Sequence, residues 1–231
     1  MATFLICHGA WSAGWAWQKV RPKLRAAGHE VFTPTYTGLG ERAHLTSPMV
    51  TLDTHIQDIL NVFSYEDLHD VVLIGHSYGG MVATGVADRV PERISQIIYV
   101  DAFVPRNGQS LNDLRQTGGA VPHAGVEGWL APPNPSPPDT SAEDLAWIGD
   151  RRRHQPIRTF TQTLTLQRET PAMPRSYIYC AKKASGDVFA QFAEQTKGDP
   201  SWSYYQRDWS HSPNITAPDG LAELLLEIVR K

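Results

Sequence analysis

Cysteine is scarce in this chain: the 231 residues include only Cys7 and Cys180, and each lies in an apolar run. Two cysteines cannot form the disulfide framework that would stabilise a chain of this size. We therefore interpret both as reduced thiols in buried strands, not as a disulfide or a metal site. A dominant charge is also lacking, since 21 Lys and Arg face 24 Asp and Glu, which gives a formal net charge of −3. This balance does not indicate a basic surface for nucleic acid.

Long apolar runs are missing as well, and none reaches the ~20 residues that a membrane span requires. The first residues, Met1–Cys7, lack the basic start and longer apolar stretch of a secretory signal. No group of His and Cys has metal-ligand spacing, and the glycines at 38–40 lack the third glycine of a dinucleotide fingerprint. We therefore expect a cytoplasmic protein, monomeric or homodimeric, that uses no cofactor or metal and contacts neither nucleic acid nor membrane.

Short apolar runs alternate with helical patterns along most of the chain. The strand-like runs are Thr3–Cys7, Glu30–Thr33, Val71–Gly75, Ile97–Asp101, Ser176–Cys180 and Ser203–Gln206. The first five are too apolar for half-exposed strands, which is typical of a parallel sheet covered on both faces. Helices are predicted over Ala16–Ala27, Leu52–Glu66, Gly80–Val90 and 217–230, the last behind a capping box of Thr216 and Asp219. The alternation predicts one doubly wound α/β domain spanning residues 1–231.

The segment from about 105 to 170 breaks this rhythm. It is rich in Pro and Gly and shows no clear strand, and residues 131–139 (APPNPSPPD) predict a stiff extended loop. Short helices are possible over Ser110–Gln116 and Ser141–Arg152. Because the segment also carries bulky aromatic residues, we interpret it as a cap over the carboxyl edge of the sheet and not as a disordered linker.

The strongest local motif is VVLIGHSYGGM at Val71–Met81. An apolar strand runs into Gly75-x-Ser77-x-Gly79, and a helical pattern follows directly. A serine on such a sharp strand-to-helix turn is pushed clear of the backbone and lies over a helix N-terminus, the arrangement called a nucleophile elbow. Small residues two before and two after it relieve the crowding. We predict that Ser77 is a nucleophile.

A serine hydroxyl needs a base near neutral pH, and a base needs a carboxylate to orient it. His211 follows the final strand-like run and precedes the last helix, so we predict it to be the general base and acid. Asp187, in the loop after the fifth strand, is our choice for the carboxylate. Asp101, at the end of the fourth strand, is the rival, and Asp199 and Asp208 are weaker candidates.

The oxyanion of an acyl-transfer intermediate needs two backbone N–H donors. The N–H of Tyr78, directly after the nucleophile, is one, and the N–H of Ala10, in the loop after the first strand, is the other. The neighbouring His8 and His76 are interpreted as structural hydrogen-bonding residues. The predicted substrate-binding residues are Gly9, Trp11, Trp129 and Trp147, the three tryptophans lining an apolar pocket under the cap or forming the core of the cap. The basic run Arg151–His154 is interpreted as a solvated helix face of the cap, with a phosphate or acidic-substrate site as the alternative.

These residues resemble the α/β-hydrolase superfamily, and above all its small branch of plant methylesterases and hydroxynitrile lyases. The matching stretches are HGAWSAGWAW (8–17), GHSYGGM (75–81), DAFVP (101–105), GDVFAQF (186–192) and the loop of His211. The resemblance implies a six-stranded parallel core, and it places the acid of that branch's triad at Asp187. Hydroxynitrile lyases of this kind have Thr where Gly9 stands and Lys where Ser212 stands, so the resemblance favours an esterase.

The motifs together predict a serine hydrolase that cleaves carboxylic esters of small, apolar or aromatic molecules through an acyl-enzyme. Three alternatives use the same residues or the same fold. They are a hydroxynitrile lyase, a hydrolase of amides or carbamates, and a binding protein that keeps the triad but turns over slowly. The sequence does not name the substrate.

Overall fold

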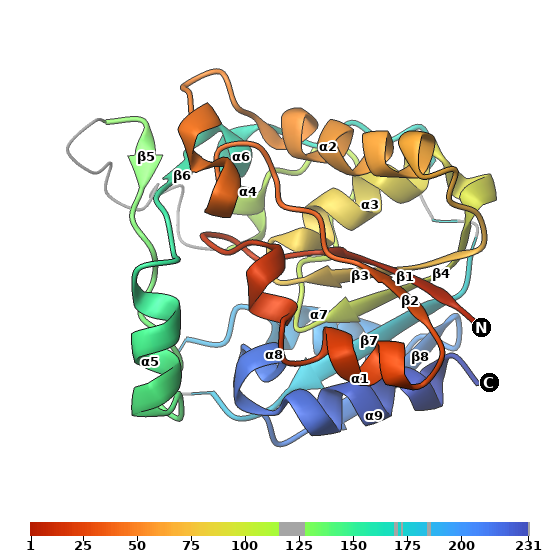
Figure 1. Cartoon of the computed structure of the whole chain (residues 1–231). Coiled ribbons are helices and arrows are strands. Elements are labelled where there is room, and N and C mark those ends of the chain that lie inside the picture. Colours follow the sequence, from red (N-terminus) through yellow and green to blue (C-terminus); the bar gives the residue numbers. More distant parts are fainter. Residues whose placement is uncertain (116–127, 169–170, 172, 184–185, 231) are drawn as a thin grey trace.

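The structure is a computed structural model, and it describes residues 1–115, 128–168, 171, 173–183 and 186–230. Six parallel strands form the central sheet in the order β2-β1-β3-β4-β7-β8. Their bounds are β1 Thr3–Cys7, β2 Glu30–Phe32, β3 Val71–His76, β4 Ile94–Val100, β7 Arg175–Cys180 and β8 Trp202–Arg207. The predicted six-stranded α/β fold is confirmed, and Figure 1 shows helices on both faces of this sheet.

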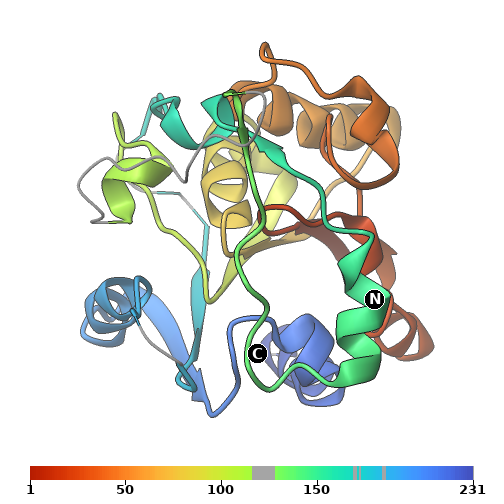
Figure 2. The same cartoon turned by 90° about the vertical axis from the view of Figure 1, so that its left-hand side faces the viewer.

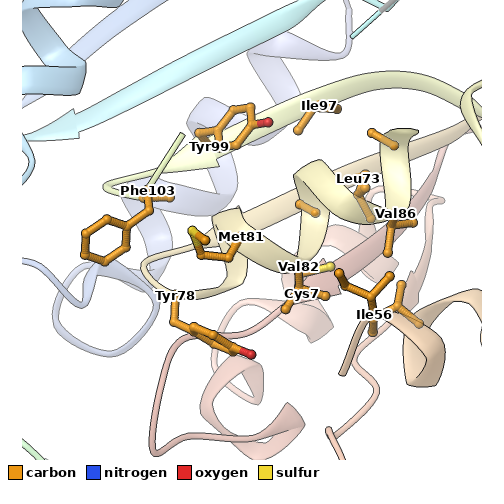
Figure 3. Packing of buried hydrophobic residues seen from close by; sticks show 14 of the residues in the cluster. Cys7, Ile56, Leu73, Tyr78, Met81, Val82, Val86, Ile97, Tyr99 and Phe103 are labelled. Carbon is orange, nitrogen blue, oxygen red and sulfur yellow. The ribbon is translucent and has the colours of Figure 1, made fainter. Parts of the chain in front are cut away.

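Each face of the sheet buries its own hydrophobic cluster because side chains alternate along a strand. On one face lie η1 Gly14–Trp17, α1 Arg21–Ala26 and α9 Pro218–Ile228, which pack on residues such as Phe4 and Ile6. On the other face lie α2 Leu52–Tyr65, α3 Gly79–Arg89 and α7 Ala190–Lys197. Figure 3 shows part of this second cluster, where Met81 and Val82 of α3 lie near Cys7 at the end of β1. Both cysteines are free and buried, as predicted.

Two local predictions were wrong, and one helix was missed. Residues 16–27 form two pieces, η1 and α1, because Pro22 lacks an N–H and disfavours helical backbone before it. Thr216 does not cap α9, since it ends the short α8 Pro213–Thr216 and its hydroxyl donates to the carbonyl of Ser212; Ala217 precedes the first residue of α9, Pro218. Helix α7 was not predicted.

The segment between β4 and β7 contains more regular structure than its composition suggested. Within its described residues lie α4 Leu111–Leu114, β5 Leu130–Ala131, α5 Ala142–Gly149, β6 Gln155–Pro156 and α6 Arg158–Thr161. The expectation of no strand was wrong, because β5 and β6 form a two-residue antiparallel ribbon. Residues 132–137 lie in neither helix nor strand, but the loop predicted over 131–139 differs at both ends, since Ala131 belongs to β5 and residues 138–139 form a turn. Figure 2 shows this chain and α5 at the edge of the molecule where the strands end.

Two remaining elements, η2 Gly40–Leu45 and η3 Pro91–Arg93, are short connections. Among the described residues, no helix has both the length and the apolar character needed to cross a membrane. The segments at the carboxyl ends of β1, β3, β4, β7 and β8 bring Ser77, Asp101, Asp187 and His211 to one edge of the sheet.

Candidate active site

Ser77 lies between the end of β3 at His76 and the start of α3 at Gly79, and its φ of 55° is the left-handed backbone expected at a nucleophile elbow. Gly79 and Gly80, which come after Tyr78, each lie close to the backbone of another segment, so neither position has room for a side chain. A Cβ on Gly79 would lie 1.9 Å from the carbonyl oxygen of Cys7, and one on Gly80 would lie 2.1 Å from that of Phe103. The motif therefore has the strand–turn–helix context on which its prediction rested.

His211 lies in the loop between β8 and α8 and bridges two groups from other strands. Its Nε2 is 3.0 Å from Ser77 Oγ, and its Nδ1 is 2.7 Å from Asp101 Oδ2. The ring of Phe189 stacks on the imidazole at 4.7 Å. These contacts form a continuous hydrogen-bonded line from the serine to a carboxylate, the geometry that allows an imidazole to take a proton from a hydroxyl.

Asp101 follows the last residue of β4 and its side chain is fully buried. Its Oδ1 accepts from the backbone N–H of Cys180, and its Oδ2 accepts from both His211 and Lys183 Nζ. Burial acts to raise the pKa of the Asp101 carboxyl, but the hydrogen bonds and positive charges of His211 and Lys183 outweigh it. The pKa lies below its ordinary value, so the group is a carboxylate at neutral pH.

The prediction that Asp187 contacts His211 was wrong, and the rival Asp101 occupies that position. Asp187 Oδ1 accepts from the backbone N–H groups of Phe189 and Ala190, and Oδ2 accepts from the hydroxyl of Tyr179. Its Oδ1 is also 3.7 Å from Lys183 Nζ. Asp187 thus caps the turn before α7, and Lys183 lies between its carboxylate and that of Asp101. The weaker candidate Asp199 accepts from Ser201 N–H and belongs to a turn before β8.

The histidines beside the serine and the first loop make structural hydrogen bonds. His76 Nε2 donates to the carbonyl of His211, which ties the loop of the base to the end of β3. His8 Nδ1 donates to Gly9 O, and its Nε2 accepts from Tyr36 N–H. Burial lowers the pKa of His8 and of His76 to about 3, so both rings stay neutral. His55, a buried residue of α2, accepts from Tyr78 Oη, and burial lowers the pKa of His55 to about 3 as well.

Ala10 and Tyr78, the predicted sources of the oxyanion donors, both line one cavity with Ser77 and His211. Gly9 lies against the serine, because a Cβ there would be 3.3 Å from Ser77 Cβ and 3.0 Å from His76 Nδ1. The absence of a side chain at position 9 therefore keeps open the space above the serine. This is the space that an ester carbonyl would need.

The segment between β4 and β7 binds the loop that follows β1, and it does so at Trp11, whose φ is 57°. The fully buried Gln155 accepts the Trp11 backbone N–H at 2.7 Å, and Trp11 Nε1 donates to Ala131 O at 3.0 Å. Gln155 also donates to the hydroxyl of Thr159. Sequence reasoning missed Gln155, and no local motif marks it. Its role depends on a contact between residues 144 positions apart.

The cavity has a volume of about 490 Å³. Of the predicted substrate-binding residues, Gly9 and Trp11 line it, but Trp129 and Trp147 do not. Trp147 packs instead against Trp15, which does line the cavity. Further apolar lining residues come from several elements: Phe103, Leu111, Ile148, Phe160, Val188 and Phe189. No group of three His, Cys, Asp or Glu side chains within the described part of the chain is arranged to hold a metal ion.

Comparisons with known proteins agree with this fold. A family model described as the alpha/beta hydrolase family matches residues 4–224. A carbendazim hydrolyzing esterase from Nocardioides sp. (strain SG-4G) is 37% identical over 97% of this chain and 98% of that protein. An extracellular alpha/beta-hydrolase from a Paenibacillus species, described as sharing structural and functional homology with tobacco salicylic acid binding protein 2, has a TM-score of 0.86. Its identity is 25%, and the match covers 98% of both chains.

The solved structure of a methylesterase from Arabidopsis is also similar, with a TM-score of 0.77 and 26% identity over 100% of this chain and 99% of that one. The family model and the relative that matches over nearly its whole length agree with the observed α/β-hydrolase fold. This chain therefore belongs to the alpha/beta hydrolase family, and it is an esterase-type hydrolase.

Proposed function

We propose that this chain is a serine esterase that cleaves carboxylic esters of small molecules through an acyl-enzyme. Ser77 is the nucleophile, His211 the general base and acid, and Asp101 the carboxylate that orients the imidazole and stabilises its charged form. The observation that carries this proposal is the hydrogen-bonded line Ser77 Oγ–His211 Nε2 and His211 Nδ1–Asp101 Oδ2, at 3.0 and 2.7 Å, on the wall of an apolar cavity.

In the proposed reaction, Ser77 Oγ attacks the ester carbonyl while His211 Nε2 takes its proton. The negative charge on the tetrahedral oxygen is stabilised by the backbone N–H groups of Ala10 and Tyr78. The C–O bond to the alcohol then breaks, and His211 returns the proton to the leaving oxygen. A water molecule, deprotonated by His211, attacks the acyl-enzyme and releases the acid, which restores Ser77.

The cap role proposed for residues 105–170 follows from their contacts with this site. Phe160 and Arg152 line the cavity, and Gln155 and Ala131 bind Trp11 next to the oxyanion loop. Such a wall shields the acyl-enzyme from bulk solvent and shapes the pocket for the substrate. The whole chain then acts as one hydrolase domain with a cap inserted between β4 and β7.

A hydroxynitrile lyase is disfavoured by two features of the site. Position 9 carries no side chain, so no hydroxyl occupies the space beside Ser77, and position 212 is a serine, not the lysine that would stabilise cyanide. The hydrolysis of carbamates or amides uses the same groups as ester hydrolysis. The test below therefore includes carbendazim beside simple esters, because one relative carries that substrate in its name.

The experiment measures hydrolysis of p-nitrophenyl esters, from acetate to octanoate, and of carbendazim by the wild type and Ser77→Ala. We expect burst kinetics with the wild type on the esters, and loss of turnover in a folded Ser77→Ala variant. Ser136→Ala is the matched control, since Ser136 lines the same cavity from the extended part of the cap. Equal rates for wild type and Ser77→Ala would refute the proposal, and cyanide release from mandelonitrile would support the lyase.

A further inference from the structure

The cavity beside Ser77 is lined by four basic side chains, and two of them have no acidic partner among the residues that the structure describes. The four are Arg115, Arg152, Lys182 and Lys183. Lys183 pairs with Asp101 and Asp187, and Lys182 pairs with Asp139 at 3.1 Å. Within the residues that the structure describes, no carboxylate oxygen forms an ion pair with Arg115 or Arg152. Asp101, Asp139 and Asp187 are thus engaged by lysines, and no described carboxylate neutralises the two guanidinium groups.

Arg152 is held in place without being neutralised. Its Nη1 donates to the backbone carbonyl of Asn134 at 2.5 Å, and its guanidinium carbon lies 5.9 Å from the centre of the Trp11 ring. A guanidinium has five N–H donors in a rigid plane, so most of them stay available. Burial lowers the pKa of Arg152 and of Arg115, which means that the cavity partly desolvates both charges. A desolvated cation with free donors on a cavity wall is complementary to an anion.

Arg152 lies on the wall that also carries the oxyanion loop. Trp11, under its guanidinium, directly follows Ala10, and the two share the cavity with Ser77. Arg115, at the end of α4, lines the same cavity from another element. An overall excess of basic residues does not explain the positive lining of the cavity, because the chain as a whole has a formal net charge of −3. Nor is it shared by the neighbours of Arg152, since Arg151 and Arg153 are exposed and outside the cavity lining.

We propose that the substrate carries, besides its ester bond, an ionised carboxylate that binds Arg152, with Arg115 adding a second positive charge to the same cavity. The proposal rests on the proposed esterase function and narrows it to half-esters of dicarboxylic acids and to esters of carboxylate-bearing alcohols. The planar fork of Arg152 offers the carboxylate parallel N–H donors, while Trp11 and the phenylalanines of the cavity contact the apolar body of the molecule.

The test compares matched esters that differ only in charge. In the first pair, mono-p-nitrophenyl glutarate carries the carboxylate on its acyl side, and p-nitrophenyl pentanoate is the neutral ester with the same leaving group. In the second pair, 4-acetoxybenzoate carries the carboxylate on its alcohol side, and 4-acetoxybenzamide is the neutral ester. We expect the wild type to prefer the anionic ester of one pair, and Arg152→Gln to lower kcat/KM for that ester by about tenfold or more, mainly through KM. The neutral ester of the pair should be hydrolysed by Arg152→Gln at a rate close to that of the wild type.

Arg153→Gln is the matched control, because it removes the same charge from an exposed neighbour and should leave the ratio between the paired esters unchanged. Added salt should weaken the preference for the anionic ester in the wild type and not in Arg152→Gln. An equal effect of Arg152→Gln on both members of each pair would overturn the proposal. Loss of the preference in Arg115→Gln alone would overturn the assignment to Arg152.

Failure of this proposal and failure of the esterase function give different results. Hydrolysis of p-nitrophenyl pentanoate that depends on Ser77 supports the esterase function, whatever the charge preference. If that hydrolysis is present and Arg152→Gln does not change the ratio of kcat/KM between the anionic and the neutral ester in either pair, the carboxylate proposal alone is refuted. A thermal unfolding measurement on Arg152→Gln shows whether the loss of the contacts with Asn134 and Trp11 has changed the fold.

Discussion

Replacement of Asp101 by Asn should cost far more activity than replacement of Asp187 by Asn. In the transition state His211 becomes a cation, and Asp101 Oδ2 lies 2.7 Å from its Nδ1. Two unit charges about 4 Å apart attract by about 4 kcal/mol at the effective dielectric constant of ~20 that suits protein sites. At about 1.4 kcal/mol for each factor of ten, Asp101→Asn should lower kcat by about 10³-fold.

Asp187→Asn should change kcat much less. Its carboxylate accepts from two backbone N–H groups before α7, and an Asn oxygen can accept from the same groups. It does not contact His211, and the charge of Lys183 stands between it and Asp101. We expect a change of less than about tenfold in kcat, together with a small loss of stability.

The assay is the single-turnover acylation rate with p-nitrophenyl acetate, measured for both variants and the wild type at the same pH. Circular dichroism and urea unfolding verify that each variant is folded. The reasoning is refuted if Asp187→Asn loses about 10³-fold while Asp101→Asn retains most of its activity. Loss of activity in both variants to the same extent would also contradict it, since of these two carboxylates it is Asp101 that accepts from the imidazole in the structure.

Three further predictions test the surroundings of the serine. Gly9→Thr should lower kcat on p-nitrophenyl acetate by about 10²-fold, because a Cβ there would lie 3.3 Å from Ser77 Cβ; unchanged kcat would contradict this. Gln155→Ala leaves the Trp11 N–H without its acceptor and should lower the free energy of unfolding by about 1–3 kcal/mol and kcat with it, as measured by urea unfolding and ester hydrolysis. Because burial lowers the pKa of His55 to about 3, the unfolded chain binds a proton that the folded chain does not, and stability should fall as the pH drops from 6.5 toward 3. Urea unfolding across that range should show a slope smaller by up to about 1.4 kcal/mol per pH unit in His55→Gln, and equal slopes would count against neutral, buried His55.

Periodicity and local motifs were sufficient for the sheet and for two members of the hydrogen-bonded line. Strands buried on both faces leave a continuous apolar run, and β3 is such a run, with every residue buried. Ser77 was found because its turn imposes small residues at fixed positions, and His211 because it follows the last strand. These signals are local in the sequence, so they can be recognised without knowledge of distant contacts.

The carboxylate could not be chosen by the same means. Asp101 and Asp187 follow the neighbouring strands β4 and β7, so both reach the same edge of the sheet. The choice depends on where the loop after β7 turns back, and there Asp187 caps the N–H groups of Phe189 and Ala190. The resemblance to the methylesterase branch pointed to Asp187, whereas the geometry of this chain points to Asp101.

The position of Asp101 makes the site more rigid than a triad with its acid on a long loop. Ser77 and Asp101, the proposed nucleophile and acid, follow adjacent strands, and the backbone joins their segments directly, because Ser77 N–H donates to Val100 O and Phe103 N–H donates to Ser77 O. Asp101 N–H in turn donates to Ile178 O of β7. Only His211 comes from a loop, and His76 clamps that loop by donating to the His211 carbonyl. Two of the three groups are therefore placed by the sheet itself, which reduces the conformational freedom that must be lost before the serine can react.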